Sequence, residues 1–74
     1  MRDRKLELSI FLKKSKLRAE VWDNLDKPKT ATEIAKDLRK HRSAISRVLL
    51  DMERVGFVKC VNSLDKSFRH YVKR

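Results

Sequence analysis

The chain has 74 residues, and its 20 Lys and Arg against 10 Asp and Glu give a formal net charge of +10 and a pI near 10.3. That length allows one small domain, and the single cysteine, Cys60, excludes an internal disulfide and a cysteine-rich zinc site. No apolar run approaches the roughly 18 to 20 residues of a membrane span, and the first residues do not show the apolar block and small-residue cleavage site expected of a secretory leader. We therefore expect a cytoplasmic protein without a metal or cofactor.

The segment from residue 4 to residue 12 is ambiguous between a strand and a helix. Its apolar residues alternate as in a strand, but Leu8, Phe11 and Leu12 also share one helical face. The basic residues that follow favour the helix. We treat residues 1–14 as an N-terminal extension and as a candidate contact in a homodimer.

Residues 15–25 are predicted to form the next helix, with Ser15 as its cap. Its apolar face consists of Leu17, Val21, Trp22 and Leu25. Trp22 is expected to anchor the core. Pro28 cannot continue a helix, so the chain turns there.

A short helix is predicted to follow Thr30, because Thr30 and Glu33 have the spacing of a capping box. Ile34, Ala35 and Leu38 form its buried face. Ala35 is small at a place where two helices must approach each other closely.

A turn through Arg39 and Lys40 leads to a helix that begins at His41 or Arg42. It is the third helix of the domain when the helix of residues 15–25 is counted as the first. The buried stripe of this helix is predicted to be Ile45, Val48, Leu49, Met52 and Val55. Gly56 stands where a left-handed residue ends a helix, and Phe57 follows as the accompanying apolar contact.

Two strands are predicted at residues 57–61 and 68–72, which are rich in aromatic and β-branched side chains. Residues 62–67 between them are mostly turn-forming, so the strands should pair as a hairpin. Helices followed by a hairpin predict a mainly α fold with a small β-hairpin, the winged helix-turn-helix, over residues 15–74.

Charge is distributed unevenly along the chain. Acidic residues are absent from 39–47 and from 66–74, whereas residues 19–28 carry three acids and one lysine. The basic side chains of the two acid-free segments are Arg39, Lys40, Arg42, Arg47, Lys66, Arg69, Lys73 and Arg74. Such a separation favours a face that binds a polyanion.

The start of the third helix holds the candidate site. If its apolar stripe faces the core, the side chains that project outward from its first turns are Arg42, Ser43, Ser46 and Arg47. Arginine can bind guanine with two hydrogen bonds, and serine can approach base edges without bulk. We expect these residues to read the major groove of double-stranded DNA.

Other basic residues are expected to hold phosphates: Arg39, Lys40, His41, Lys66 and Arg69. His41 has capping as an alternative role. Two of the residues expected in the groove could instead have a purely structural role. Arg47 can pair with Asp51, and Ser43 can be a helix cap.

Three strings carry a resemblance to a known family. They are Thr-Ala-Thr-Glu-Ile-Ala-Lys-Asp-Leu at 30–38, His-Arg-Ser-Ala-Ile-Ser-Arg-Val-Leu at 41–49 and Val-Gly-Phe-Val at 55–58. Residues 15–72 resemble the winged helix-turn-helix domain of MarR-like and ArsR-like transcriptional regulators, particularly small archaeal ones. The resemblance implies transcription regulation and DNA contacts by Arg42, Ser43, Ser46 and Arg47.

The chain departs from that family's pattern at three points. Arg39 and Lys40 stand in the turn, where the family usually has a glycine and an apolar residue. The paired cysteines of metal-sensing members are missing, and so are the long dimerisation helices of the MarR-like proteins. A homodimer would therefore use the N-terminal segment or the first helix.

Two other functions remain open on the residues alone. A protein-interaction module would be favoured if Leu6, Leu8, Ile10 and Phe11 formed an exposed apolar patch. RNA binding is compatible with the charge, although aromatic residues for base stacking are few. We do not expect an enzyme, because the sequence contains no nucleophile-base pair, phosphate loop or carboxylate pair.

Overall fold

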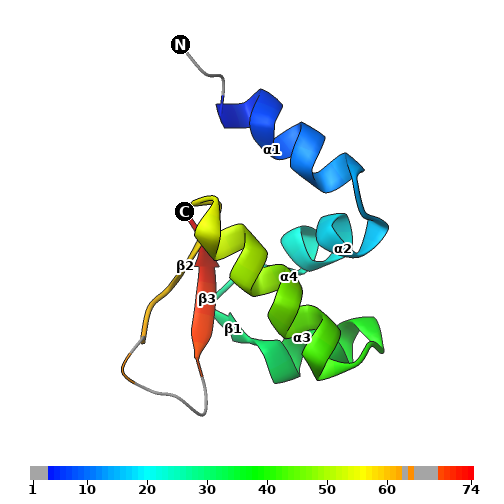
Figure 1. Ribbon diagram of the computed structural model, residues 1–74. Coiled ribbons are helices and arrows are strands. Elements are labelled where there is room, and N and C mark those ends of the chain that lie inside the picture. Colours follow the sequence, from blue (N-terminus) through cyan, green and yellow to red (C-terminus); the bar gives the residue numbers. More distant parts are fainter. Residues whose placement is uncertain (1–3, 63, 65–68) are drawn as a thin grey trace.

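The computed structural model describes residues 4–62, 64 and 69–74 of the chain. In chain order the elements are α1 (Arg4–Lys13), α2 (Lys16–Asn24), β1 (Lys29–Thr30), α3 (Ala31–Leu38), α4 (Arg42–Arg54), β2 (Val58–Cys60) and β3 (His70–Lys73). Helices α3 and α4 follow one another through a short turn, and β2 and β3 form the hairpin beside them (Figure 1). This arrangement confirms the predicted winged helix-turn-helix.

Helix α1 resolves the ambiguity of the N-terminal segment in favour of a helix. Its inner face packs Leu8, Phe11 and Leu12 against the core, and the Phe11 ring meets the Phe57 ring edge-on at 5.4 Å. Leu6 and Ile10, the other residues of the apolar alternation in this segment, lie on the outer side of α1. Their side chains are 58% and 50% exposed, respectively.

Helix α2 begins where the sequence predicts, because the Ser15 hydroxyl accepts a hydrogen bond from the Arg18 amide at 3.4 Å. The Arg18 guanidinium lies 4.0 Å from the centre of the Phe11 ring and donates to the Phe11 carbonyl at 3.3 Å. Arg18 therefore joins α1 to α2. Trp22 packs at the edge of the core, edge-on to Phe57.

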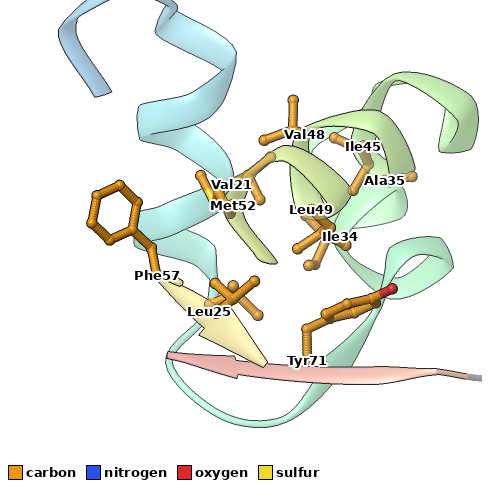
Figure 2. Close-up of a cluster of buried hydrophobic side chains, with 11 residues drawn as sticks. Val21, Leu25, Ile34, Ala35, Ile45, Val48, Leu49, Met52, Phe57 and Tyr71 are labelled. Atoms are coloured by element: carbon orange, nitrogen blue, oxygen red, sulfur yellow. The ribbon is translucent and has the colours of Figure 1, made fainter. Parts of the chain in front are cut away.

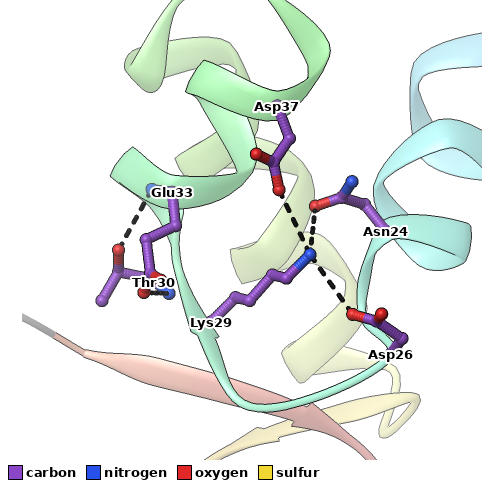
Figure 3. Close-up of polar contacts among 6 residues, drawn as sticks. All are labelled: Asn24, Asp26, Lys29, Thr30, Glu33 and Asp37. Carbon is purple, nitrogen blue, oxygen red and sulfur yellow. Dashed lines mark hydrogen bonds and ion pairs between the residues drawn. The ribbon is translucent and has the colours of Figure 1, made fainter.

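Helix α3 starts with the predicted capping box, which Figure 3 shows. The Thr30 hydroxyl accepts from the Glu33 amide at 3.1 Å, and the Glu33 carboxylate accepts from the Thr30 amide at 3.0 Å. The bond from the Thr30 amide is the main reason that the pKa of Glu33 lies below its ordinary value. These bonds satisfy amides that the helix itself leaves without partners.

Strand β1 was not predicted from the sequence. Lys29 pairs with Tyr71 and Thr30 with His70, so β1 adds an edge to the hairpin and gives a three-stranded antiparallel sheet in the order β1-β3-β2. A strand of two residues has no periodicity to detect. It exists because β3 offers free backbone groups at the point where the chain enters α3.

The turn between α3 and α4 is made without glycine. Arg39 adopts a left-handed conformation with φ 56°, and its amide and that of Lys40 donate to carbonyls in the last turn of α3. A side chain in this conformation costs about 1–2 kcal/mol. The packing of α3 against α4 on both sides of the turn, together with these hydrogen bonds, offsets this free-energy cost.

We expect Arg39→Gly to raise the free energy of unfolding by about 0.5–1 kcal/mol, because glycine adopts positive φ without steric strain. Urea denaturation measures this. The matched control is Lys40→Gly, which removes the same charge at a residue whose φ is not positive and should lower stability. Equal effects of the two substitutions would contradict the argument.

The core lies where α2, α3, α4 and the sheet meet, as Figure 2 shows. Ile45, Leu49 and Met52 of α4 are fully buried, and Val21, Ile34 and Val58 reach them from α2, α3 and β2. Gly56 has φ 85°, and the Phe57 amide donates to the Met52 carbonyl at 2.9 Å, which ends α4 as predicted.

The prediction that Val55 belongs to the buried stripe of α4 is wrong. Val55 is the C-cap residue of α4 and is 51% exposed, because it lines an open hollow with Ile10 and Phe11 of α1 beyond the end of the buried stripe.

Lys29 is buried beneath the entry to α3, where its ammonium group is surrounded by oxygens (Figure 3). The Nζ lies 3.1 Å from Asn24 Oδ1, 3.2 Å from Asp37 Oδ2 and 3.2 Å from Asp26 Oδ1. Burial by itself lowers the pKa of Lys29, but the bonds to Asp37 and Asp26 outweigh it and hold the pKa above its ordinary value. The hydrogen bond from Lys29 is also the main reason that the pKa of Asp26 is lowered.

We expect Lys29→Met to lower the free energy of unfolding at pH 7 by about 1 kcal/mol, since the buried stem is kept but the polar contacts are lost. Because the folded-state pKa of Asp26 is depressed, its contribution is present above pH 3.8 and is lost as the pH falls through the folded value. The difference between variant and wild type should therefore shrink toward about pH 2. Urea denaturation at both pH values, with exposed Lys36→Met as control, tests this, and a gap independent of pH would refute it.

The hairpin confirms both predicted strands with shifted ends: β2 lacks the predicted Phe57 and Val61, and β3 begins after Arg69 and extends to Lys73. Val58 pairs with Lys73, Lys59 with Val72 and Cys60 with Tyr71. Residues 63 and 65–68, which include most of the predicted turn, the start of the second predicted strand and Lys66, lie outside the described residues. None of the described helices is long and apolar enough to span a membrane.

Candidate nucleic-acid interface

The outer face of α4 carries the predicted groove residues. Burial of Ile45, Val48 and Leu49 fixes the rotation of this helix, so the residues between them turn outward. Arg42, Ser43 and Arg47 are exposed, and Ser46 is half-buried. The four therefore share one surface at the start of the helix, as their spacing predicts.

The structure decides between the alternative roles of these residues. Ser43 lies inside α4 and is not its cap, and the residue at the capping position is His41, whose side chain makes no capping hydrogen bond. Asp51 has its carboxylate 3.9 Å from the Arg18 guanidinium on α2. Within the described part of the chain, Arg42 and Arg47 form no ion pair, so both guanidinium groups are available to a ligand.

Two residues of this face, Leu50 and Arg54, were not among the site residues predicted from the sequence. Leu50 is 46% exposed, and it lines a hollow on the outer side of α4 together with Ser43, Ser46, Arg47, Asp51 and Arg54. The signal was present, because residues 43, 46, 47, 50 and 54 follow helical spacing on one face. An exposed leucine between serines and arginines offers an apolar contact of the kind that proteins make with the thymine methyl group.

A pocket of about 190 Å³ lies where α4 meets the start of α3 and the hairpin. Arg42 lines it from α4, and Arg69 lines it from the residue before β3. The remaining lining residues are Thr30, Ala31, Thr32, Ser46, Leu50 and Tyr71. The pocket therefore combines two guanidinium groups with hydroxyls and the N-terminal end of α3, a suitable environment for one phosphate group.

Arg69 has an incomplete set of partners at this pocket. Its Nε is buried and has no hydrogen-bond partner among the described residues. Burial raises the pKa of the neighbouring Tyr71 above its ordinary value, and a hydrogen bond from Arg69 acts in the opposite direction. The Tyr71 phenol therefore stays neutral at neutral pH.

The threonines at the start of α3 divide into two roles. The Thr30 hydroxyl is occupied by the Glu33 amide, so Thr30 acts as the helix cap. Thr32 is exposed and lines the pocket, which leaves its hydroxyl beside Arg42 and Arg69.

Three of the other predicted phosphate contacts, Arg39, Lys40 and His41, are exposed in the turn that leads into α4, and Lys66 lies outside the described residues. Lys73 is directed elsewhere, because its Nζ lies 4.8 Å from the centre of the Trp22 ring. The basic residues that surround the start of α4 are therefore those of the turn and Arg69.

Comparison of the chain with protein-family models, with curated proteins and with solved structures finds no match. The assignment of a function therefore rests on the residues and their geometry. Among the described residues, no group of three or more His, Cys, Asp or Glu side chains is placed to hold a metal ion.

Proposed function

We propose that this protein binds double-stranded DNA, with α4 in the major groove and the hairpin against the backbone or the adjacent minor groove. The observation that supports this most is the outer face of α4. There Arg42 and Arg47 are exposed without ion pairs in the described chain, beside Ser43 and Ser46. The N-terminal part of the second helix is the part of a helix-turn-helix that contacts base edges.

The residues divide by the chemistry that they offer. Ser43, Ser46, Arg47 and Leu50 present hydrogen-bonding and apolar groups to base edges. Arg42 serves at the boundary, because it belongs to the helix face and also to the pocket that it shares with Arg69. Arg39, Lys40, His41 and, from the sequence, Lys66 are proposed to contact phosphates.

A regulatory role follows from the resemblance of residues 15–72 to MarR-like and ArsR-like regulators. We propose that the protein is a small regulator of transcription that binds preferred sites in DNA. The role is one of binding without catalysis. The acids of α2 and the loop after it, among them Glu20, Asp23 and Asp26, line neither hollow of the proposed face, and the acid that does line one, Asp51, lies 3.9 Å from the Arg18 guanidinium.

Fluorescence anisotropy with a labelled random-sequence duplex tests the proposal. We expect binding to weaken by roughly several hundred-fold between about 50 and 200 mM salt, since about five basic side chains would replace condensed counterions. Unlabelled duplex DNA should compete better than duplex RNA or single strands, because α4 fits only the wide major groove of B-form DNA. Equal competition by RNA, or binding that is indifferent to salt, would refute DNA-groove binding.

A further inference from the structure

Two arginines from distant parts of the chain line the pocket between α4, the start of α3 and the hairpin, which we call the Arg42–Arg69 pocket. Arg42 is the first residue of α4, and Arg69 precedes β3, which lies beside β1 at the entry to α3 (Figure 1). None of the described residues that line the pocket is acidic. Two like charges at one pocket repel each other, so the arrangement favours an anion that neutralises both.

Arg69 contributes a donor that the described chain leaves unsatisfied. Its Nε is buried and has no hydrogen-bond partner among the described residues. A buried donor without an acceptor lowers stability, so nearly all such groups in folded proteins have a partner. The same side chain is hydrogen-bonded to Tyr71, another residue of the pocket wall. An anion in the pocket would supply the acceptor that Arg69 lacks.

Hydroxyl groups add further donors to the pocket. Thr32 is exposed and lines it from α3, and Ser46 lines it from α4. The Thr30 hydroxyl oxygen accepts from the Glu33 amide, which leaves its proton as a donor. Donors therefore come from several elements, as the recognition of several oxygens on one group requires.

The size and the charge of the pocket select its ligand. Its volume of about 190 Å³ is below the roughly 300–1,000 Å³ of pockets that enclose a whole small molecule, so it accommodates a single chemical group. A phosphate monoester carries about −1.5 to −2 charges near neutral pH and offers three acceptor oxygens, which matches two guanidinium groups. A phosphodiester of the DNA backbone carries one charge and has two free oxygens, so it matches them less well.

We propose that the Arg42–Arg69 pocket binds a phosphate dianion, either as inorganic phosphate or as the terminal group of a phosphate monoester. Arg42 and Arg69 neutralise the anion, and the hydroxyls of Thr32 and Ser46 donate to its oxygens. The inference does not depend on DNA binding, and its first test contains no DNA.

An NMR titration of the full chain with inorganic phosphate near neutral pH tests the proposal. Phosphate should shift the Nε–H signal of Arg69 and the amide signals of Ala31 and Thr32 with one saturable dissociation constant. We expect a value of about 0.1–5 mM, because a ligand this small has few atoms with which to bind. Chloride at equal ionic strength should not produce these shifts. Shifts that do not saturate, or equal shifts with chloride, would overturn the proposal.

Substitution of each arginine tests the assignment of the residues. Arg42→Gln and Arg69→Gln should each weaken phosphate binding at least about tenfold, because each removes one of the two charges. Thermal unfolding checks both variants, and since they lie on different elements, failure of one to fold leaves the other as the test. The control, Lys36→Gln, removes one positive charge from an exposed residue outside the pocket and should leave the affinity unchanged. Equal effects of all three substitutions would overturn the proposal, because binding would then report only the net charge.

Two further ligands identify the form of phosphate that is bound. Dimethyl phosphate has the single charge of the DNA backbone and should bind at least about tenfold more weakly than inorganic phosphate. Equal binding would overturn the assignment to a dianion. Methyl phosphate separates the two dianions: equal affinity identifies a monoester as the ligand, and much weaker binding identifies inorganic phosphate.

The pocket shares Arg42 with the proposed DNA-binding face, so a consequence for DNA binding follows, and this consequence rests on the proposed function. Phosphate bound to Arg42 withdraws that guanidinium from DNA. At constant ionic strength, phosphate should therefore lower the DNA affinity of wild type but not that of Arg69→Gln, as fluorescence anisotropy measures. DNA binding by wild type that is independent of phosphate would refute this coupling. Absence of all DNA binding would refute the proposed function and leave the phosphate titration as the test of the pocket.

Discussion

Replacement of both Arg42 and Arg47 by alanine is expected to reduce the affinity for a preferred DNA site by about 30-fold or more. Each arginine that makes a bidentate base contact contributes about 1–3 kcal/mol, and the two residues line different hollows, so their effects should add. The slope of log affinity against log salt should also fall in magnitude by up to about 0.9 for each lost phosphate contact. Anisotropy titrations of both proteins on selected and random duplexes measure these effects.

The control for this variant is Lys16→Ala/Lys27→Ala, which removes the same charge from exposed positions on or beside α2. It should change the affinity only slightly, because neither lysine lines a hollow at the proposed face. An equal loss on every DNA sequence would reassign Arg42 and Arg47 to phosphate contacts. If the double variant and the control bind equally well, α4 is not the element that contacts DNA.

Leu49→Ala is expected to lower the free energy of unfolding by about 2–5 kcal/mol, because Leu49 is fully buried at the centre of the core and leaves a cavity when truncated. A domain of this size has a total stability of only roughly 4–11 kcal/mol, so the variant should unfold at a much lower temperature. Calorimetry or urea denaturation measures the loss. Where the variant is still folded, its affinity for DNA should match the wild type, since Leu49 does not reach the outer face.

The adjacent leucine provides the matched control. Leu50→Ala removes the same atoms from a side chain that is 46% exposed, so its effect on stability should be within about 0.5–1 kcal/mol. It should instead weaken DNA binding, because Leu50 lines both hollows of the proposed face. Equal destabilisation by the two substitutions would contradict the assignment of one leucine to the core and the other to the interface.

Local signals in the sequence determined most of the helical part of the fold. The Ser15 cap, the capping box of Thr30 and Glu33, and Gly56 with its positive φ are present where the sequence predicts them. Each involves residues at most a few positions apart, so the side chains that satisfy the helix ends can be identified without knowledge of the rest of the chain. The periodic burial of Ile45, Val48, Leu49 and Met52 likewise determined which face of α4 turns outward.

Contacts between distant parts of the chain were decided by tertiary structure alone. Strand β1 forms only because β3 lies beside it, and the pocket of Arg42 and Arg69 exists only because the hairpin packs against the start of α4. Asp51 lies 3.9 Å from Arg18 of α2, whereas its spacing on α4 had offered Arg47 as an alternative partner. The exposure of Val55 depends on how the end of α4 lies beside α1, whose Phe11 packs against Phe57. Such features follow from the packing of whole elements, whereas periodicity and capping report only on the residues within each element.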